Sequence, residues 1–119
     1  MDFYCKMFVQ TPLTRTELAG RLAQEFGWRF DTYFSTENDY LSLDIRDNEE
    51  FDATSLNKEA TGFLYFRYFF DIELLDECKV DKYKKQVARV VYLLQETKCL
   101  VVTACSFEEE LPESMKRSL

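Results

Sequence analysis

The stretch that decides the fold is residues 62–74, GFLYFRYFFDIEL, in which six of thirteen residues are aromatic and one is arginine. Successive side chains of a strand point to opposite faces of a sheet, and here both alternating sets carry aromatic residues. We expect the first set to face the core: Leu64, Phe66, Tyr68, Phe70, Ile72 and Leu74. The second set is Phe63, Tyr65, Arg67, Phe69, Asp71 and Glu73. The pattern therefore predicts a long strand with a second, aromatic face that the core does not use.

Two amphipathic helices are predicted on either side of this stretch. Thr14 and Glu17 form a T-x-x-E capping box, and Gly27 provides a stop, so we expect a helix over residues 15–26. A second helix follows the aromatic strand, with Asp81 as its predicted N-cap. Its apolar stripe repeats at helical spacing through Tyr83, Val87, Val90, Val91 and Leu94.

Period-two alternation predicts the remaining strands, over residues 3–10, 28–34, 40–46 and 100–105. The polar residues 35–39 suggest a hairpin turn between the second and third of these. Residues 47–61 carry no clean period, and we interpret them as an acidic surface loop with room for one helical turn. Residues 100–105, LVVTAC, form the most apolar segment and are expected to be a central strand.

This order of elements predicts an α+β fold, specifically a ferredoxin-like βαββαβ two-layer sandwich with an extra hairpin. Both helices would lie on one face of an antiparallel sheet, within a single domain over residues 1–112, and residues 113–119 would form a frayed tail. The other sheet face would then expose aromatic side chains. It requires a cover, either local chain, a second copy of the protein or a different protein.

Charge narrows the choice of partner. The chain has 22 acidic and 15 basic residues and a formal net charge of −7, which opposes direct binding to nucleic acid. Aromatic residues on such a sheet are also typical of an RNA-binding RRM, but Asp44, Asp71 and Glu73 flank them here in place of lysines. The acidic runs could simply be solvated surface. Beside exposed aromatic residues, they would instead form a rim suited to a basic protein.

We therefore predict a partner-binding surface on the second aromatic face. Tyr65, Arg67 and Phe69 are the predicted anchors, because large rigid side chains and arginine dominate the centres of interfaces. The predicted charged rim consists of Glu49, Glu50, Asp52, Asp71 and Glu73.

Nothing in the sequence predicts an enzyme. The chain has no histidine, no glycine-rich phosphate loop and no nucleophile elbow, so we expect no catalytic residue, no metal and no cofactor. The four cysteines form no C-x-x-C pair and are expected to be free thiols. We find no signal peptide or long apolar run, and we expect a cytoplasmic protein that has no membrane partner.

Two elements carry a resemblance to known proteins, GFLYFRYFFDIE at residues 62–73 and TACSFEEELP at residues 103–112. They resemble elements of small bacterial proteins that look like the acidic immunity proteins of polymorphic toxin and contact-dependent inhibition systems. The resemblance implies a non-enzymatic protein that binds and neutralises a cognate basic toxin domain, for which a nuclease is one candidate. The alternative is a self-associating, ligand-sensing or regulatory ferredoxin-like domain that forms a homodimer through its sheet face.

Overall fold

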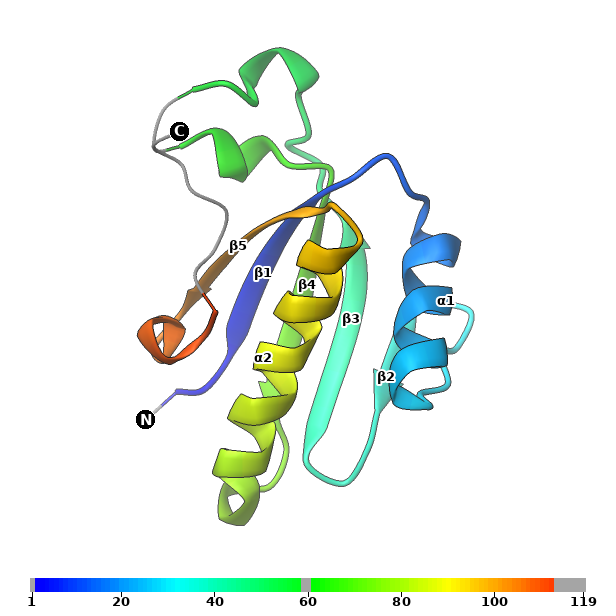
Figure 1. The fold of residues 1–119 in the computed structure, drawn as a ribbon, viewed down its shortest axis with the longest axis vertical. Helices are drawn as coiled ribbons and strands as arrows, with labels where there is room; N and C mark the ends of the chain where they lie inside the picture. Colours follow the sequence, from blue (N-terminus) through cyan, green and yellow to red (C-terminus); the bar gives the residue numbers. More distant parts are fainter. Residues whose placement is uncertain (1, 59–60, 113–119) are drawn as a thin grey trace.

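The computed structural model describes residues 2–58 and 61–112 (Figure 1). Within them the chain forms an α+β fold with two helices and a five-stranded antiparallel sheet of order β2-β3-β4-β1-β5. The α+β class and the antiparallel sheet are as predicted. The strands are β1 (Cys5–Gln10), β2 (Ser35–Glu37), β3 (Leu41–Asp47), β4 (Tyr68–Leu74) and β5 (Leu100–Cys105), and the helices are α1 (Arg15–Phe26) and α2 (Val80–Glu96).

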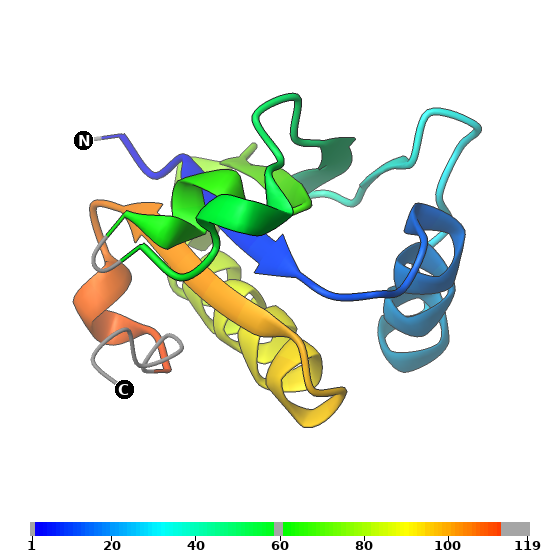
Figure 2. The ribbon, with the colours of Figure 1, turned by 90° about the horizontal axis from the view of Figure 1, so that it is seen from above.

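Both helices pack into one core on the same face of the sheet. Figure 2 shows α2 beneath the sheet, and Figure 1 shows α1 at the edge that β2 forms. The core is continuous from helix to sheet because the apolar stripes of both helices meet the inward side chains of β1, β3, β4 and β5. Its fully buried members include Met7, Val9, Leu18, Leu22, Leu43, Phe70, Ile72, Val87, Val90 and Val101.

The first helix has the predicted bounds and the predicted caps. The Thr14 side chain accepts from the Glu17 N–H at 3.1 Å, and Glu17 Oε1 accepts from the Thr14 N–H at 2.9 Å. Gly27 ends the helix with φ of 73°, a left-handed conformation in which glycine has no Cβ to clash. Local sequence alone therefore sets both ends of α1.

The prediction of a strand over residues 63–74 is wrong for residues 63–67. Gly62–Tyr65 forms a 3₁₀ turn, and β4 begins at Tyr68. From that point the predicted alternation holds, since Tyr68, Phe70 and Ile72 are buried in the main core. Upstream it fails, because Leu64 is 42% exposed and Phe66 is buried with Phe8 on the other side of the sheet.

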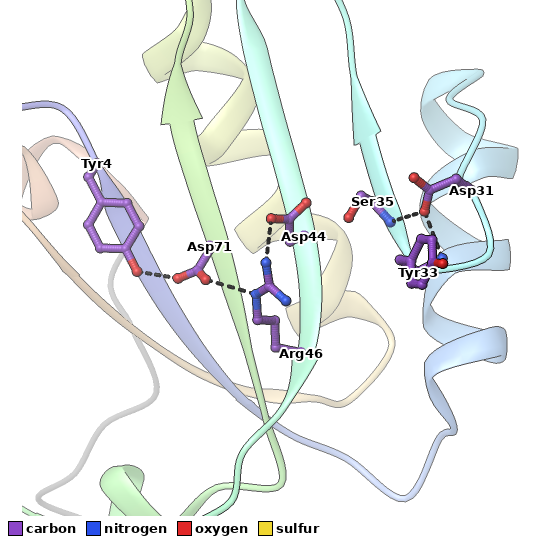
Figure 3. Close-up of polar contacts among 7 residues, drawn as sticks. All are labelled: Tyr4, Asp31, Tyr33, Ser35, Asp44, Arg46 and Asp71. Atoms are coloured by element: carbon purple, nitrogen blue, oxygen red, sulfur yellow. Dashed lines mark hydrogen bonds and ion pairs between the residues drawn. The ribbon is translucent and has the colours of Figure 1, made fainter.

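The predicted hairpin is also shifted along the chain. Residues 28–34 form no strand, and β2 occupies Ser35–Glu37, where we expected the turn. Trp28 instead packs on Phe26 at the end of α1, with ring centroids 4.8 Å apart. A tight turn follows, in which the Asp31 carboxylate accepts from the N–H groups of Tyr33 and Ser35 (Figure 3).

Two further expectations are corrected in the C-terminal half. Helix α2 begins at Val80, so Asp81 lies in its first turn and does not cap it, while Asp76 caps a preceding 3₁₀ turn at Glu77–Lys79. Strand β5 is an edge of the sheet and not its centre. It is nevertheless apolar because α2 covers one of its faces and a second small core covers part of the other. The predicted tail, residues 113–119, lies outside the described residues.

Residues 48–58 and 61–66, which we name the cover loop, shield part of the sheet face opposite the helices. Leu56, Phe63 and Phe66 of the cover loop pack with Phe8 and Val102 of the sheet to form the second core. Asn48 fastens the loop to itself, because its side-chain amide donates to the carbonyl oxygens of Leu64 at 3.0 Å and Phe66 at 2.7 Å. Local chain thus covers part of the aromatic surface that the sequence predicted to be open.

The fold of the cover loop depends on one glycine. A Cβ added at Gly62 would lie 2.3 Å from the backbone oxygen of Leu56, a separation far below van der Waals contact. The Gly62 N–H also donates to the Lys58 carbonyl at 2.8 Å, which fixes the two chain segments against each other. Only glycine allows this approach of two backbones.

We predict that Gly62→Ala lowers the free energy of unfolding by about 1–3 kcal/mol, because the loop must move to accept the added methyl group. The matched control is Gly20→Ala, at an exposed position in the middle of α1 where an added Cβ meets no atom within 4 Å. That substitution should raise stability by about 0.5–1 kcal/mol. Denaturant unfolding of the wild type and the two variants measures both changes in the free energy of unfolding. Equal changes at the two glycines would contradict the role given to Gly62.

Candidate functional site

The face of the sheet turned away from the helices, which we name the open face, brings together side chains from three strands. Phe8 of β1 lies opposite Phe69 of β4, and Phe69 in turn lies opposite Arg46 of β3. Asp71 is flanked in the same way by Lys6 and by Asp44. Directly paired residues of antiparallel strands share a face, so these side chains form one continuous surface.

A polar network crosses the part of the open face that the cover loop does not reach (Figure 3). Arg46 Nε donates to Asp71 Oδ2 at 3.1 Å, and an Arg46 terminal nitrogen lies 3.0 Å from Asp44 Oδ2. The Tyr4 hydroxyl donates to the other oxygen of Asp71. Burial, and then this hydrogen bond, raise the pKa of Tyr4 well above its ordinary value. Asp71 is therefore held rigidly by two partners.

The aromatic part of the open face is shielded as well. Phe8 is buried and packs edge-on against Phe63 of the cover loop, with centroids 5.1 Å apart. Phe69 is half-buried beside Phe8, and Lys6 Nζ lies 4.4 Å from the Phe69 centroid and 5.1 Å from that of Phe8. The lysine thus forms a cation–π contact with both rings, and only part of Phe69 remains accessible.

An open depression of about 440 Å³ lies where β3, the start of α1 and the cover loop meet. The Phe69 ring contributes the apolar part of its wall, and the rest of the lining is charged or polar: Arg15, Arg46, Asp47, Asn48, Glu49 and Glu50. Arg15 is paired with Asp47 at 3.4 Å, and Arg46 is paired with Asp44 and Asp71. Both arginines are thereby neutralised, whereas Glu49 and Glu50 stand exposed in a turn and give the depression a negative edge.

The structure brings together five of the eight predicted site residues. Phe69, Glu49 and Glu50 line the depression. Asp71 and Glu73 follow Phe69 along β4 at alternate positions, so they continue the same surface away from the cover loop. Glu73 is exposed at the far end of this line, where it borders a smaller hollow with Tyr4.

The other three predicted residues have local structural roles. Arg67 reaches back to the carbonyl oxygen of Pro12 at 3.2 Å, while its backbone N–H donates to Gln10 Oε1 at 2.8 Å. Tyr65 is half-buried in the 3₁₀ turn, with Lys58 Nζ 5.1 Å from its ring centroid. Asp52 caps the turn Ala53–Ser55. The strand break before β4 removes Tyr65 and Arg67 from the row of Phe69.

Sequence reasoning missed two kinds of residue on this surface. Arg46 is not among the predicted site residues, although its alternation with Asp44 indicates that the two side chains share a face. The exposed apolar residues of the cover loop, Phe51 at 44% and Leu64 at 42%, were also missed. Leu64 was assigned to the core by a strand pattern that the glycine turn interrupts, and no signal in the sequence distinguished it.

Comparison with protein families, with curated proteins and with solved structures finds no match to this chain. Within residues 2–58 and 61–112, neither helix is long and apolar enough to cross a bilayer. In the same described part of the chain, no three histidine, cysteine or acidic side chains lie in an arrangement that could hold a metal ion.

Asp52 gives the cover loop a dependence on pH. Its carboxylate accepts from the Thr54 hydroxyl at 2.6 Å, the Ser55 hydroxyl at 2.9 Å and the Thr54 N–H at 2.9 Å. These bonds, the Thr54 hydroxyl first, lower the pKa of Asp52 below its ordinary value. The unfolded chain takes up a proton at Asp52 at a higher pH than the folded one. The stabilisation is therefore complete above about pH 4 and is lost as the pH falls through the folded pKa.

We predict that Asp52→Asn is less stable than the wild type at pH 7 and that the difference shrinks as the pH falls below about 4. Urea unfolding of both proteins across this range measures the effect. Glu109→Gln, which alters an exposed carboxylate in the turn Glu108–Glu110, is the control and should change stability little at any pH. A difference between wild type and Asp52→Asn that does not vary with pH would contradict the role of the charge.

Proposed function

We propose that this protein is a non-enzymatic binding protein of the immunity type, which neutralises a cognate toxin domain by stoichiometric binding. The observation that carries the proposal is the depression beside Phe69, where an aromatic wall lies next to the exposed carboxylates of Glu49 and Glu50. The resemblance of residues 62–73 and 103–112 to immunity proteins supplies the class of partner.

The charge of the surface favours a basic partner. The chain carries a formal net charge of −7, and the two arginines of the depression are each paired with carboxylates. A basic toxin domain, such as a nuclease whose active site must attract phosphate, would be drawn to the exposed carboxylates of Glu49 and Glu50 at the edge of the depression. Complementary charge of this kind accelerates encounter and suppresses wrong partners.

Apolar contact would come from the cover loop together with Phe69. Phe51 directly follows Glu50, and its N–H donates to the Asn48 carbonyl at 3.0 Å. The Leu64 carbonyl accepts from the Asn48 side chain. The backbone of both Phe51 and Leu64 is therefore hydrogen-bonded to Asn48, which lines the depression. An aromatic anchor at the centre with a polar, solvent-accessible rim around it is the usual arrangement of a protein interface.

The fold within the α+β class is part of the proposal. We assign it to the ferredoxin-like βαββαβ plan, with β2 as an additional strand at the β3 edge. If β2 is set aside, β1 and β4 occupy the centre and β3 and β5 the flanks. This order supports the assignment. In that plan the two strands of each βαβ unit are not neighbours, because one strand of the other unit lies between them.

The alternative, a homodimer formed by two sheets packed face to face, is less favoured by the chemistry of the open face. Such packing would bury Lys6, Arg46, Asp44 and Asp71 away from water. Burying ion pairs costs more than their mutual attraction returns unless every polar atom finds a partner. A partner that binds at the depression and the cover loop would leave this network solvated.

The charge reversal Glu49→Lys with Glu50→Lys tests the surface. With the toxin domain in hand, we expect association to slow by about tenfold or more at low ionic strength. The dissociation rate should change less, and the effect should shrink as salt is added. The matched control is Glu108→Lys with Glu109→Lys, which makes the same change in net charge at exposed residues that do not line the depression. Stopped-flow binding measures the rates, and equal slowing by both variants would contradict the assignment of the surface.

The partner itself is identified by affinity capture of the tagged protein from its native cell at low salt. Sedimentation then gives the molecular mass of the eluted complex. We expect a basic partner at one-to-one stoichiometry. This partner should show no catalytic activity while it is bound. Recovery of the protein alone, as a dimer, would overturn the proposal in favour of the self-associating domain.

A further inference from the structure

Cys5 and Cys105 are direct cross-strand neighbours. Strand β1 pairs antiparallel with β5, and the register places the two cysteines opposite each other. Paired residues of antiparallel strands have Cα atoms about 4.5–5.5 Å apart, which is within the range of about 4.4–6.8 Å that disulfides span. Their side chains share the helix side of the sheet, where both belong to or pack against the main core. The backbone therefore already meets the distance requirement of a disulfide.

The two thiols differ in exposure and in ionisation. Cys5 is fully buried, whereas Cys105 is partly accessible at the end of β5. A hydrogen bond from the Cys5 thiol, and a further one from the Phe107 N–H, lower the pKa of Cys105. The same thiol–thiol bond, together with burial, raises the pKa of Cys5. Cys105 is thus the more accessible and the more readily ionised of the two thiols, and Cys5 is its buried neighbour.

We propose that Cys5 and Cys105 form a reversible dithiol–disulfide site whose oxidant is a low-molecular-weight disulfide such as glutathione disulfide. The Cys105 thiolate attacks one sulfur of the oxidant, whose S–S bond breaks and releases one glutathione thiolate. Cys5 then gives up its proton and attacks Cys105 Sγ, and the second glutathione leaves. The protein loses two electrons and two protons, and the oxidant is reduced to two glutathione thiols.

The disulfide would fasten the edge of the sheet. Among the described strands, β5 pairs only with β1, so the cross-link would join this edge strand covalently to its one neighbour. The loop that it closes runs from residue 5 to residue 105 and contains both helices and the other strands. A cross-link across so long a loop restricts the unfolded chain strongly, so oxidation should stabilise the fold. The site lies on the helix side and does not depend on the proposed function.

The test is oxidation of the full-length protein in glutathione redox buffers, followed by mass spectrometry of the intact chain and of its unreduced peptides. We expect the loss of two hydrogens, a cross-linked pair of peptides that contain Cys5 and Cys105, and continued alkylation of exposed Cys78. The midpoint of denaturant unfolding should rise on oxidation and return on reduction.

Variants separate the two roles. Cys5→Ala should trap glutathione on Cys105 as a stable mixed disulfide, and Cys105→Ser should abolish both the cross-link and the rise in unfolding midpoint. Cys78→Ser, the control, should behave as the wild type. Lasting glutathione attachment to wild-type Cys105, a cross-link that uses Cys78 or Cys99, or four thiols that stay reactive in oxidising buffer would each overturn the proposal.

Discussion

A sheet that carries both helices on one face must shield the apolar side chains of its other face from water, and the cover loop is how this chain does so. Phe8 and Val102 would otherwise be exposed, and they are buried because Leu56, Phe63 and Phe66 lie over them. The loop can reach them only because the Gly62 backbone passes against the Leu56 carbonyl oxygen. This close approach lies at the first residue of the 3₁₀ turn Gly62–Tyr65, which precedes β4.

The cover loop divides the open face into two parts with different chemistry. Beneath the loop, aromatic rings pack as an ordinary small core. Beyond it, Arg46, Asp71 and Tyr4 hold one another in a polar network that stays in contact with water. The depression beside Phe69 lies at the boundary, where a part-exposed ring and exposed carboxylates occur together. Such a boundary offers a partner both apolar contact and charge, and the proposed function rests on it.

The sequence predicted those features that local chemistry controls. The capping box of Thr14 and Glu17 fixed α1, and alternation assigned Tyr68, Phe70 and Ile72 correctly to the core. The strand prediction failed where a tertiary contact sets the local structure. The apolar pattern of residues 63–66 is compatible with a strand and equally with a turn that packs on another apolar surface. The site followed the same rule: Phe69, Asp71 and Glu73 share a strand face as expected, whereas Tyr65 and Arg67 lie beyond the break.

Backbone amide hydrogen exchange in the cover loop tests the central claim most directly. The N–H groups of Asn48, Asp52 and Gly62 donate to the carbonyl oxygens of Arg67, Tyr65 and Lys58 respectively. If the loop packs on the sheet as a fixed layer, these amides should exchange far more slowly than those of an unstructured peptide, as β4 amides do. Exchange at the unstructured rate, with β4 still protected, would mean that the aromatic face is open and that another molecule must cover it.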